Sequence, residues 1–431
     1  MLTKKELKLL TELLNLEGIK VSDKHQHEGI GIILKIESIE KESACNICGI
    51  RSNRLHQNHQ QIIKDLDWGE QAVFLEVNRR QFKCEKCKKP FSEELKFVKE
   101  RRRYTKRLAA KTIEEVLADD IRSVAKKGRV TEKEIERMLK DASEDLSKVK
   151  PIGLKRLGID EIALVKGQGK YCAVLIDLDR SKLLMIVEGR TKEEIKKVLE
   201  GWGTEVLEGI EEVSIDLWKG YKSLAMEMMP NAQVVADRFH VMAQINQELD
   251  GERKSGLLRS GLPTMEARQD KEKRRIILEI KQAKTSEEKL DKEIILAGIV
   301  NSKYVILKNE KDLNDKQKDK LTQVQNVSDR LKIMHQLKEE FRKIFEKTEK
   351  WTDGLLGLGK WLSIAQKYFI NSKSTIYRWF DEILAYFNHR TTSGVVEGIN
   401  NKLKLIKRSG YGFTNFENFR NRCLLNWHFT R

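Results

Sequence analysis

The stretch LKRLGIDEIAL, residues 154–164, opens the part of the chain whose pattern decides the fold. It is a short apolar run that carries two acids, Asp160 and Glu161. Two further apolar runs follow it, KYCAVLIDLD at 170–179 and SKLLMIVEGR at 181–190. Runs of this length between polar boundaries are typical of β-strands. Because they follow one another closely, they predict an antiparallel meander of three strands.

The segments after the meander alternate between helix and strand patterns. They are a capped helix at 191–203 (TKEEIKKVLEGWG), a strand at 211–221 (EEVSIDLWKGY), a helix at 222–229 (KSLAMEMM) and a strand at 232–241 (AQVVADRFHV). This element order is that of a ribonuclease-H-like sheet, whose fourth and fifth strands enter through helical crossovers. We therefore predict a ribonuclease-H-like mixed sheet.

Asp160 and Asp216 are the candidate catalytic acids. Asp216 ends the predicted fourth strand, which neighbours the first strand in this topology. Two adjacent carboxylates repel each other unless a cation holds them. Mg²⁺ prefers oxygen ligands, and two such ions about 4 Å apart serve phosphoryl transfer on nucleic acids. The pair therefore predicts a catalytic site for Mg²⁺ or Mn²⁺, with ordinary surface aspartates as the alternative. Asp237, at the end of the fifth strand, is an auxiliary candidate that either joins the site or pairs with Arg238.

Four of the six cysteines form two Cys-x-x-Cys pairs, Cys45 with Cys48 and Cys84 with Cys87. Each such turn directs two thiolates at one centre, and two turns complete a tetrahedral Zn²⁺ site. Disulfides or four unrelated thiols are the alternatives. We predict a structural zinc module, because four protein ligands leave no open position for catalysis.

The most basic segment follows the zinc module and contains KERRRYTKR at 99–107. A run of this kind suits phosphate contacts and insertion into a DNA groove, while a solvated linker is the alternative. The predicted DNA contacts of this arm are Arg101, Arg102, Arg103, Lys106 and Arg107.

The next segment predicts a helix-turn-helix. Apolar residues at helical spacing run to position 125, and KKG at 126–128 makes a turn. Thr131 then matches a helix N-cap, with Glu134 as its capping-box partner. Any helical hairpin has this pattern, and the acid-rich second helix is a poor match to a recognition helix.

A lysine-rich stretch at about 245–385 is helical in pattern and poor in strand signals. We interpret it as a helical insertion between the sheet and a final helix. Trp351, Trp361 and Trp379 are predicted to lie in its core.

The stretch GVVEGINNKLKLIKRSGYGF at 394–413 predicts a helix with one acid, Glu397, at its start. A carboxylate on a helix beside the two aspartates would complete a three-acid site. A plain amphipathic surface helix is the alternative. The predicted DNA contacts of this helix are Asn400, Asn401, Lys404, Lys407 and Arg408.

The length, net charge and hydropathy of the chain also indicate a multi-domain protein that binds nucleic acid. The chain has 431 residues, so two to four domains are expected. Its net charge is +17, which indicates a polyanionic partner, with nucleic acid ahead of a membrane surface. The sequence has no apolar run of about 18 residues and no signal-peptide pattern, so we expect no membrane association and a cytoplasmic location.

With these motifs in place, the chain resembles the bacterial insertion-sequence DDE transposases of the ISL-three family. The resemblance rests on the paired CxxC knuckles, RRRYTKR, GIDEIALVKGQGKY, SIDLWKGY, ADRFHV and VEGINNKLKLIKRSGYGF. It implies Asp160, Asp216 and Glu397 as a catalytic triad that binds Mg²⁺. It also implies double-stranded DNA as the partner, both the terminal inverted repeats of the element and target DNA. A homo-oligomer is expected in the active complex.

The predicted organisation is multi-domain, α+β with α/β. The domains are a zinc-binding domain (1–98), a basic arm and helix-turn-helix (99–148), the first part of the ribonuclease-H-like core (149–245), a helical insertion (246–385) and the last helices of the core (386–431). Two other functions fit the motifs less completely. One is a ribonuclease-H-like nuclease or resolvase, and the other is a non-enzymatic zinc and helix-turn-helix regulator.

Overall fold

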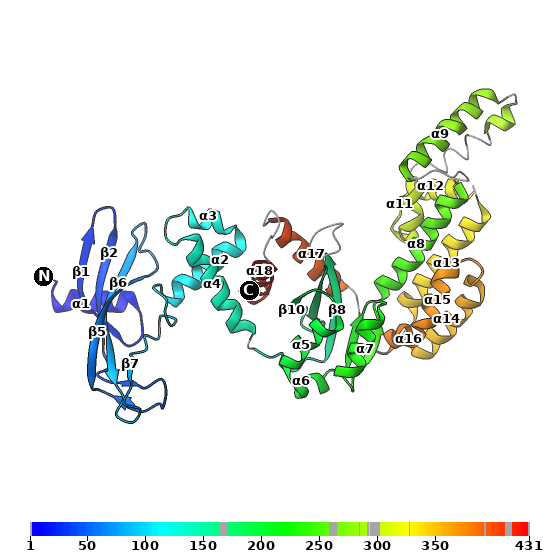
Figure 1. The fold of residues 1–431 in the computed structure, drawn as a ribbon. Coiled ribbons are helices and arrows are strands. Elements are labelled where there is room, and N and C mark those ends of the chain that lie inside the picture. Colours follow the sequence, from blue (N-terminus) through cyan, green and yellow to red (C-terminus); the bar gives the residue numbers. More distant parts are fainter. Residues whose placement is uncertain are drawn as a thin grey trace. The chain divides into compact units, whose positions relative to one another are not determined.

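The computed structural model of the protein describes residues 2–147, 149–163, 171–257, 265–283, 285–290, 293, 302–326, 328–391, 394–409 and 416–429. The chain divides into two compact units, and Figure 1 labels most of their helices and several of their strands. Unit 1 comprises Met1–Val149 and Lys404–Arg431, and unit 2 comprises Lys150–Leu403. Across the described ranges, no helix is both long and apolar enough to span a membrane.

The N-terminal part of unit 1 is a five-stranded sheet that packs against helix α1 (Lys4–Leu14). Its strand order is β1-β2-β6-β5, and β7 pairs with β6. The strands are β1 (Ile19–His27), β2 (Gly31–Ser38), β5 (Leu55–Lys64), β6 (Val73–Lys83) and β7 (Pro90–Ser92), while β3 (Ser43–Ala44) and β4 (Arg51–Ser52) form a separate ribbon. Buried and exposed residues alternate along β2 and β6, so one face forms the core with α1.

The helix-turn-helix follows as α2 (Lys106–Ala118), α3 (Ile121–Ala125) and α4 (Glu132–Ser147). Gly128 makes the turn before α4 at a φ of +81°, in the left-handed region that favours glycine. The predicted capping box is confirmed. Thr131 N donates to Glu134 Oε2 at 2.8 Å, and Glu134 N donates to Thr131 Oγ1 at 3.3 Å.

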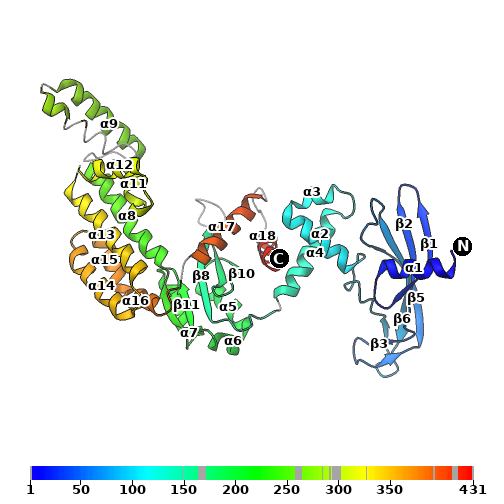
Figure 2. The same cartoon turned by 180° about the vertical axis from the view of Figure 1, so that it is seen from behind.

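A fourth helix, α18 (Phe416–Phe429), packs against α2 and α4 (Figures 1 and 2). Leu425 has no exposed surface and belongs to the apolar core of the three earlier helices. Ser143 Oγ on α4 donates to Asn421 Oδ1 at 2.7 Å, and Arg422 donates to the carbonyl of Asp119, the C-cap of α2. From the sequence we predict that residues 386–431 belong to the sheet domain, and that domain boundary stays a prediction. The contacts of α18 described above are with the helices of the helix-turn-helix.

Unit 2 is built on a mixed sheet with the order β10-β9-β8-β11-β12. The strands are β8 (Arg156–Ala163), β9 (Tyr171–Asp177), β10 (Lys182–Glu188), β11 (Glu212–Ile215) and β12 (Gln233–Ala236). β8, β9 and β10 form an antiparallel meander, while β11 runs parallel to both β8 and β12. The predicted order of elements and the predicted pairing of the first and fourth strands are therefore confirmed.

The crossover helices are α5 (Lys192–Trp202), α6 (Thr204–Glu208) and α7 (Lys219–Met228). Figure 2 shows α7 next to β11, which it contacts. Tyr221 of α7 is completely buried in one cluster with Leu157 and Ile159 of β8. Because side chains alternate along a strand, Asp160 points to the other face of the sheet from Leu157 and Ile159.

Helices follow β12 in the region where the sequence predicts a helical insertion. Its helices are α8 (Arg238–Leu257), α9 (Met265–Gln282), α11 (Ser302–Leu307), α12 (Asp315–Gln325), α13 (Asp329–Lys347), α14 (Trp351–Ala365), α15 (Ile370–Arg378) and α16 (Phe380–His389). Trp361 and Trp379 are 3% and 2% exposed, which confirms them as core residues. The prediction was wrong for Trp351, which is the first residue of α14 and is 41% exposed.

Helix α17 (Gly394–Ser409) carries the predicted third acid. Val396, Ile399, Leu403 and Ile406 are buried along one side of the helix, three or four residues apart. Glu397 lies on the exposed side. Residues up to Leu403 belong to unit 2, and the helix continues from Lys404 into unit 1.

Candidate active site and zinc centre

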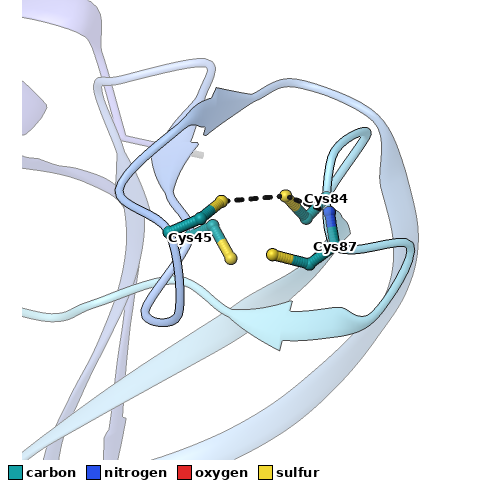
Figure 3. A group of neighbouring side chains, drawn as sticks. Cys45, Cys84 and Cys87 are labelled. Atoms are coloured by element: carbon teal, nitrogen blue, oxygen red, sulfur yellow. Dashed lines mark hydrogen bonds between the residues drawn. The ribbon is translucent and has the colours of Figure 1, made fainter.

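The thiols of Cys45, Cys48, Cys84 and Cys87 form one cluster. Figure 3 shows Cys45, Cys84 and Cys87 turned toward one another. All four sulfurs lie within 4.8 Å of one another, and those of Cys48 and Cys84 are 3.5 Å apart. Hydrogen bonding to Cys48, followed by burial and hydrogen bonding to Cys84, raises the pKa of the Cys87 thiol to about 12. The Cys87 thiol therefore stays protonated unless a cation compensates the charge of its thiolate, and Zn²⁺ can do so.

Two tight turns hold these thiols in place. Gly49 N donates to the carbonyl of Cys45 at 2.8 Å, and Lys88 N donates to the carbonyl of Cys84 at 2.9 Å. Tetrahedral zinc with Zn–S bonds of about 2.3 Å requires sulfurs about 3.8 Å apart. The 3.5 Å between Cys48 and Cys84 and the 4.8 Å limit on all pairs are compatible with this spacing. The four residues therefore fit a structural Zn²⁺ ion.

The second site lies where β8 and β11 run side by side. Ile215 pairs with Ile159 in a parallel register, so Asp216 and Asp160 are the next residues on the two strands. Asp160 is 7% exposed, and its Oδ1 accepts from Glu161 N at 2.7 Å. The two carboxylates thus converge as the strand order predicts.

His240, in the first turn of α8, reaches into the same site. Its Nε2 lies 2.7 Å from Asp216 Oδ1 and 3.6 Å from Asp160 Oδ1. The three side chains offer ligand atoms within 4.8 Å of one another. The sequence-based site missed His240. The signal was the Asp-x-x-His spacing from Asp237, which places the histidine one turn after the end of β12.

The pKa values of this cluster report two crowded acids. Burial, and secondarily the charge of Asp160, raises the pKa of Asp216 to about 6. Burial would also raise the pKa of Asp160, but hydrogen bonds from His240, Glu161 N and Asn400 lower it. Burial by itself would lower the pKa of His240, whereas hydrogen bonds to the two aspartates raise it to about 10. An imidazolium at this position therefore partly neutralises the acids, as a metal ion would.

Helix α17 contacts the site through Asn400, whose Nδ2 donates to Asp160 Oδ2. The other amide atom, Asn400 Oδ1, is buried and accepts no hydrogen bond from any described residue. A buried oxygen without a donor beside two carboxylates is a ligand set that suits a hard cation such as Mg²⁺. Sequence reasoning assigned Asn400 to DNA; the structure places its amide against Asp160.

Glu397 lies three residues before Asn400 on α17 and is exposed. Residues three apart share a helix face, so Glu397 lies one turn from the residue that binds Asp160. Its carboxylate is not among the ligand atoms that the described residues bring together at Asp160, Asp216 and His240.

Asp237, the auxiliary candidate, caps the start of α8. Its Oδ1 accepts from Phe239 N at 2.8 Å, and burial raises its pKa. The cap explains why an acid stands at this position. Whether it also binds metal stays a prediction.

Some arginines of the basic arm form ion pairs with acids inside unit 1. Arg102 donates to both carboxylate oxygens of Asp141 at 2.6 and 2.7 Å. Arg107 pairs with the fully buried side chain of Asp65. The other predicted DNA contacts of the arm, Arg101, Arg103 and Lys106, are exposed. Charge alone could not separate these two groups, because the acids that pair with the arm are distant in sequence.

A chain that joins a helix-turn-helix to a recessed pair of carboxylates belongs to the class of DNA-processing proteins. The family comparison makes the class specific. The model described as the transposase domain of the ISL3 type matches residues 157–423, which is more than half of the chain. The protein therefore belongs to the ISL3 family of transposases, as the motifs indicate.

Two further models of the same family match ahead of that domain. The zinc finger of the transposases of IS204, IS1001, IS1096 and IS1165 matches residues 41–87, which contain the four cysteines. The helix-turn-helix domain of transposase family ISL3 matches residues 93–143. The zinc module and the DNA-binding helices are thereby confirmed.

Individual relatives are also insertion-sequence transposases. The chain is 27% identical over 414 residues to the transposase for insertion sequence element IS1001 of Bordetella parapertussis, covering 93% of each protein. It is 28% identical over 278 residues to the transposase for element IS1557 of Mycobacterium tuberculosis, covering 60% of this chain and 57% of that protein.

Proposed function

We propose that the protein cleaves DNA at the terminal inverted repeats of an insertion sequence and joins the freed end to target DNA. The mixed sheet of unit 2 is then a ribonuclease-H-like core. Asp160, Asp216 and Glu397 are its catalytic acids, and the protein acts as a homo-oligomer on paired ends. The metal is Mg²⁺ or Mn²⁺.

One observation carries the proposal. Asp160 and Asp216 meet on adjacent parallel strands, and Asn400 of α17 is hydrogen-bonded to Asp160. That bond brings the helix with Glu397 to the two aspartates, although the three acids are far apart in sequence. Supporting it, Asn400 Oδ1 is buried without a donor among the described side chains, so the site retains an unused oxygen ligand.

Bound Mg²⁺ would neutralise the scissile phosphate and activate the attacking oxygen. The residues of the chain have separate tasks. Asp160 and Asp216 supply carboxylate oxygens from a rigid sheet, which fixes their separation. Asn400 orients Asp160 through its amide hydrogen. Glu397, exposed on the same helix face, supplies the third carboxylate when DNA is bound.

The test is metal-dependent cleavage of a labelled duplex that carries the inverted-repeat end bordering the gene. Glu397→Gln, Asp160→Asn and Asp216→Asn should each lower the cleavage rate by about 1,000-fold or more and leave duplex affinity within about twofold. Glu193→Gln, an exposed acid on α5, is the matched control and should cleave normally. Normal cleavage by Glu397→Gln would refute the assigned triad.

Product analysis separates the alternatives. A transposase joins the labelled end to a second DNA molecule, so strand-transfer products should appear with Mg²⁺. Cleavage without joining would instead identify a nuclease or resolvase. Binding without any metal-dependent cleavage would identify a DNA-binding regulator.

A further inference from the structure

An exposed aromatic ring lies against His240, the histidine that contacts the two acids. Phe239 follows Asp237 in the first turn of α8 and is 56% exposed. Its ring centroid lies 5.5 Å from that of His240, at an interplanar angle of 84°. Since the His240 imidazole lies against both aspartates, the Phe239 ring contacts a side chain of the proposed catalytic site.

A second exposed aromatic ring follows the other aspartate. Trp218 is 39% exposed, and its backbone N donates to the carbonyl of Asp216 at 2.7 Å. Its ring packs edge-on against Tyr221 at 4.6 Å, so its position is fixed. Two partly exposed rings next to residues of one charged site offer apolar surface that a ligand at this site can cover.

The acids themselves are recessed. The side chains of Asp160 and Asp216 are 10% and 17% exposed. Mg²⁺ binds its oxygen ligands at about 2.0–2.1 Å, so a phosphate that shares an ion with these acids must enter the recess. A strand released from its partner can enter more deeply than the backbone of an intact duplex. Release exposes base faces, which aromatic rings cover by stacking.

We propose that Phe239 stacks on an unpaired base of the DNA strand whose phosphodiester enters the Asp160–Asp216 site. The ligand is a forked duplex, in which the base pairs at the element end are open. This inference deepens the proposed function and rests on it. A DNA base is the occupant, rather than an apolar side chain of a protein, because each ring has a cation as its neighbour in sequence, Lys219 after Trp218 and Arg238 before Phe239. An apolar protein partner gains nothing from these charges, whereas the strand needs them for its phosphates.

The test is a comparison of two DNA probes by equilibrium titration in Ca²⁺, a cation that also takes oxygen ligands. One probe is a fully paired duplex of the inverted-repeat end, and the other has its two outermost base pairs mismatched. The measured quantity is the ratio of the two affinities. The wild-type protein should prefer the mismatched probe by on the order of 10-fold, the scale of one stacked base.

Phe239→Ala should abolish this preference and bind the paired duplex normally. Phe239→Tyr keeps the ring and should keep the preference. Tyr304→Ala is the matched control, because Tyr304 in α11 is 57% exposed and lies outside the site. Thermal melting of each variant checks that the fold is intact.

Two results would overturn the inference: a wild-type protein with equal affinity for both probes, or a Phe239→Ala variant that retains the preference. Cleavage assays with the same proteins report separately on the proposed function. If the wild-type protein binds the ends but cleaves neither probe, the proposed chemistry falls, while the affinity ratio still decides the role of Phe239.

Discussion

His240 Nε2 lies 2.7 Å from Asp216 Oδ1 and joins the first turn of α8 to the end of β11. The imidazole therefore occupies the place where a cation must compensate Asp160 and Asp216. It also gives the acids a counter-charge of the protein's own. A protein with such a device tolerates two adjacent carboxylates before metal binds.

His240→Gln should make the protein depend more strongly on metal. Without the imidazolium, the repulsion between Asp160 and Asp216 is relieved only by Mg²⁺, so added Mg²⁺ should raise the melting temperature of the variant more than that of the wild type. A difference of about 2–4 °C corresponds to roughly 1 kcal/mol for a unit of this size. Asp216→Asn should suppress the metal effect in both backgrounds. Equal metal shifts in wild type and His240→Gln would contradict this role.

Two neighbouring arginines should separate DNA binding from stability. The Arg101 side chain is 87% exposed, whereas Arg102 binds the buried Asp141. Arg101→Ala should lower duplex affinity and reduce the salt slope of log K by about 0.9, the contribution of one phosphate contact. Its free energy of unfolding should be unchanged.

Arg102→Ala should instead lower the free energy of unfolding by about 1–3 kcal/mol, because it leaves the Asp141 carboxylate without its donor. Fluorescence anisotropy at several salt concentrations and urea titration measure the two effects. The assignment of Arg101 to DNA binding and Arg102 to stability would be contradicted if both variants changed only duplex affinity, or both changed only the free energy of unfolding.

Zinc content should depend on the four clustered thiols alone. Cys84→Ser should reduce bound zinc from one ion per chain to none and unfold the N-terminal module, because three thiolates with one hydroxyl bind Zn²⁺ poorly. Cys423→Ala removes a buried thiol in α18 and should keep the zinc. Metal analysis by mass spectrometry and circular dichroism provide the measurements. Loss of zinc from Cys423→Ala, or its retention by Cys84→Ser, would contradict the assignment.

The helical insertion should lose stability in mild acid because of His335. This residue has no exposed surface, and burial lowers its pKa from 6.5 to about 4, with Lys338 adding to the effect and Glu339 opposing it. Between these pH values the unfolded chain takes up a proton that the folded chain does not, so stability falls as the pH falls. The full contribution is about 3 kcal/mol between pH 7 and pH 4.

His335→Leu removes that proton uptake, so its free energy of unfolding should fall less steeply with pH than that of the wild type. Urea titrations at pH 7.0 and pH 4.5 give the comparison. If the free energy of unfolding fell equally with pH in the wild type and in His335→Leu, groups other than His335 would cause the loss of stability.

Sequence was sufficient for the sheet of unit 2 because its strands are short apolar runs with acids at their ends. The predicted order places β8 beside β11, and backbone pairing then brings Asp160 to Asp216 without any further information. The zinc site was predictable because its four ligands lie in two short Cys-x-x-Cys turns, which are visible in the sequence.

Sequence was insufficient to predict the contacts of a side chain whose partner lies far away in the chain, because the same residue could equally be exposed to solvent. Arg102 and Arg107 belong to one charge run with Arg101, yet their acids, Asp141 and Asp65, lie about 40 residues away in opposite directions. His240 was missed because its Asp-x-x-His spacing from Asp237 does not show which acids the histidine meets. Only the meeting of α8 with β8 and β11 identifies it.

The packing of α18 has a consequence for synthesis of the protein. Its Leu425, Asn421 and Arg422 complete a module whose other helices end at Ser147. At about 5–20 residues per second, ribosomes need tens of seconds to travel from one part to the other. During that interval the nascent helix-turn-helix lacks a quarter of its helices, so a prematurely terminated product cannot finish the DNA-binding module. A product that ends before α18 therefore leaves the apolar core around Leu425 incomplete.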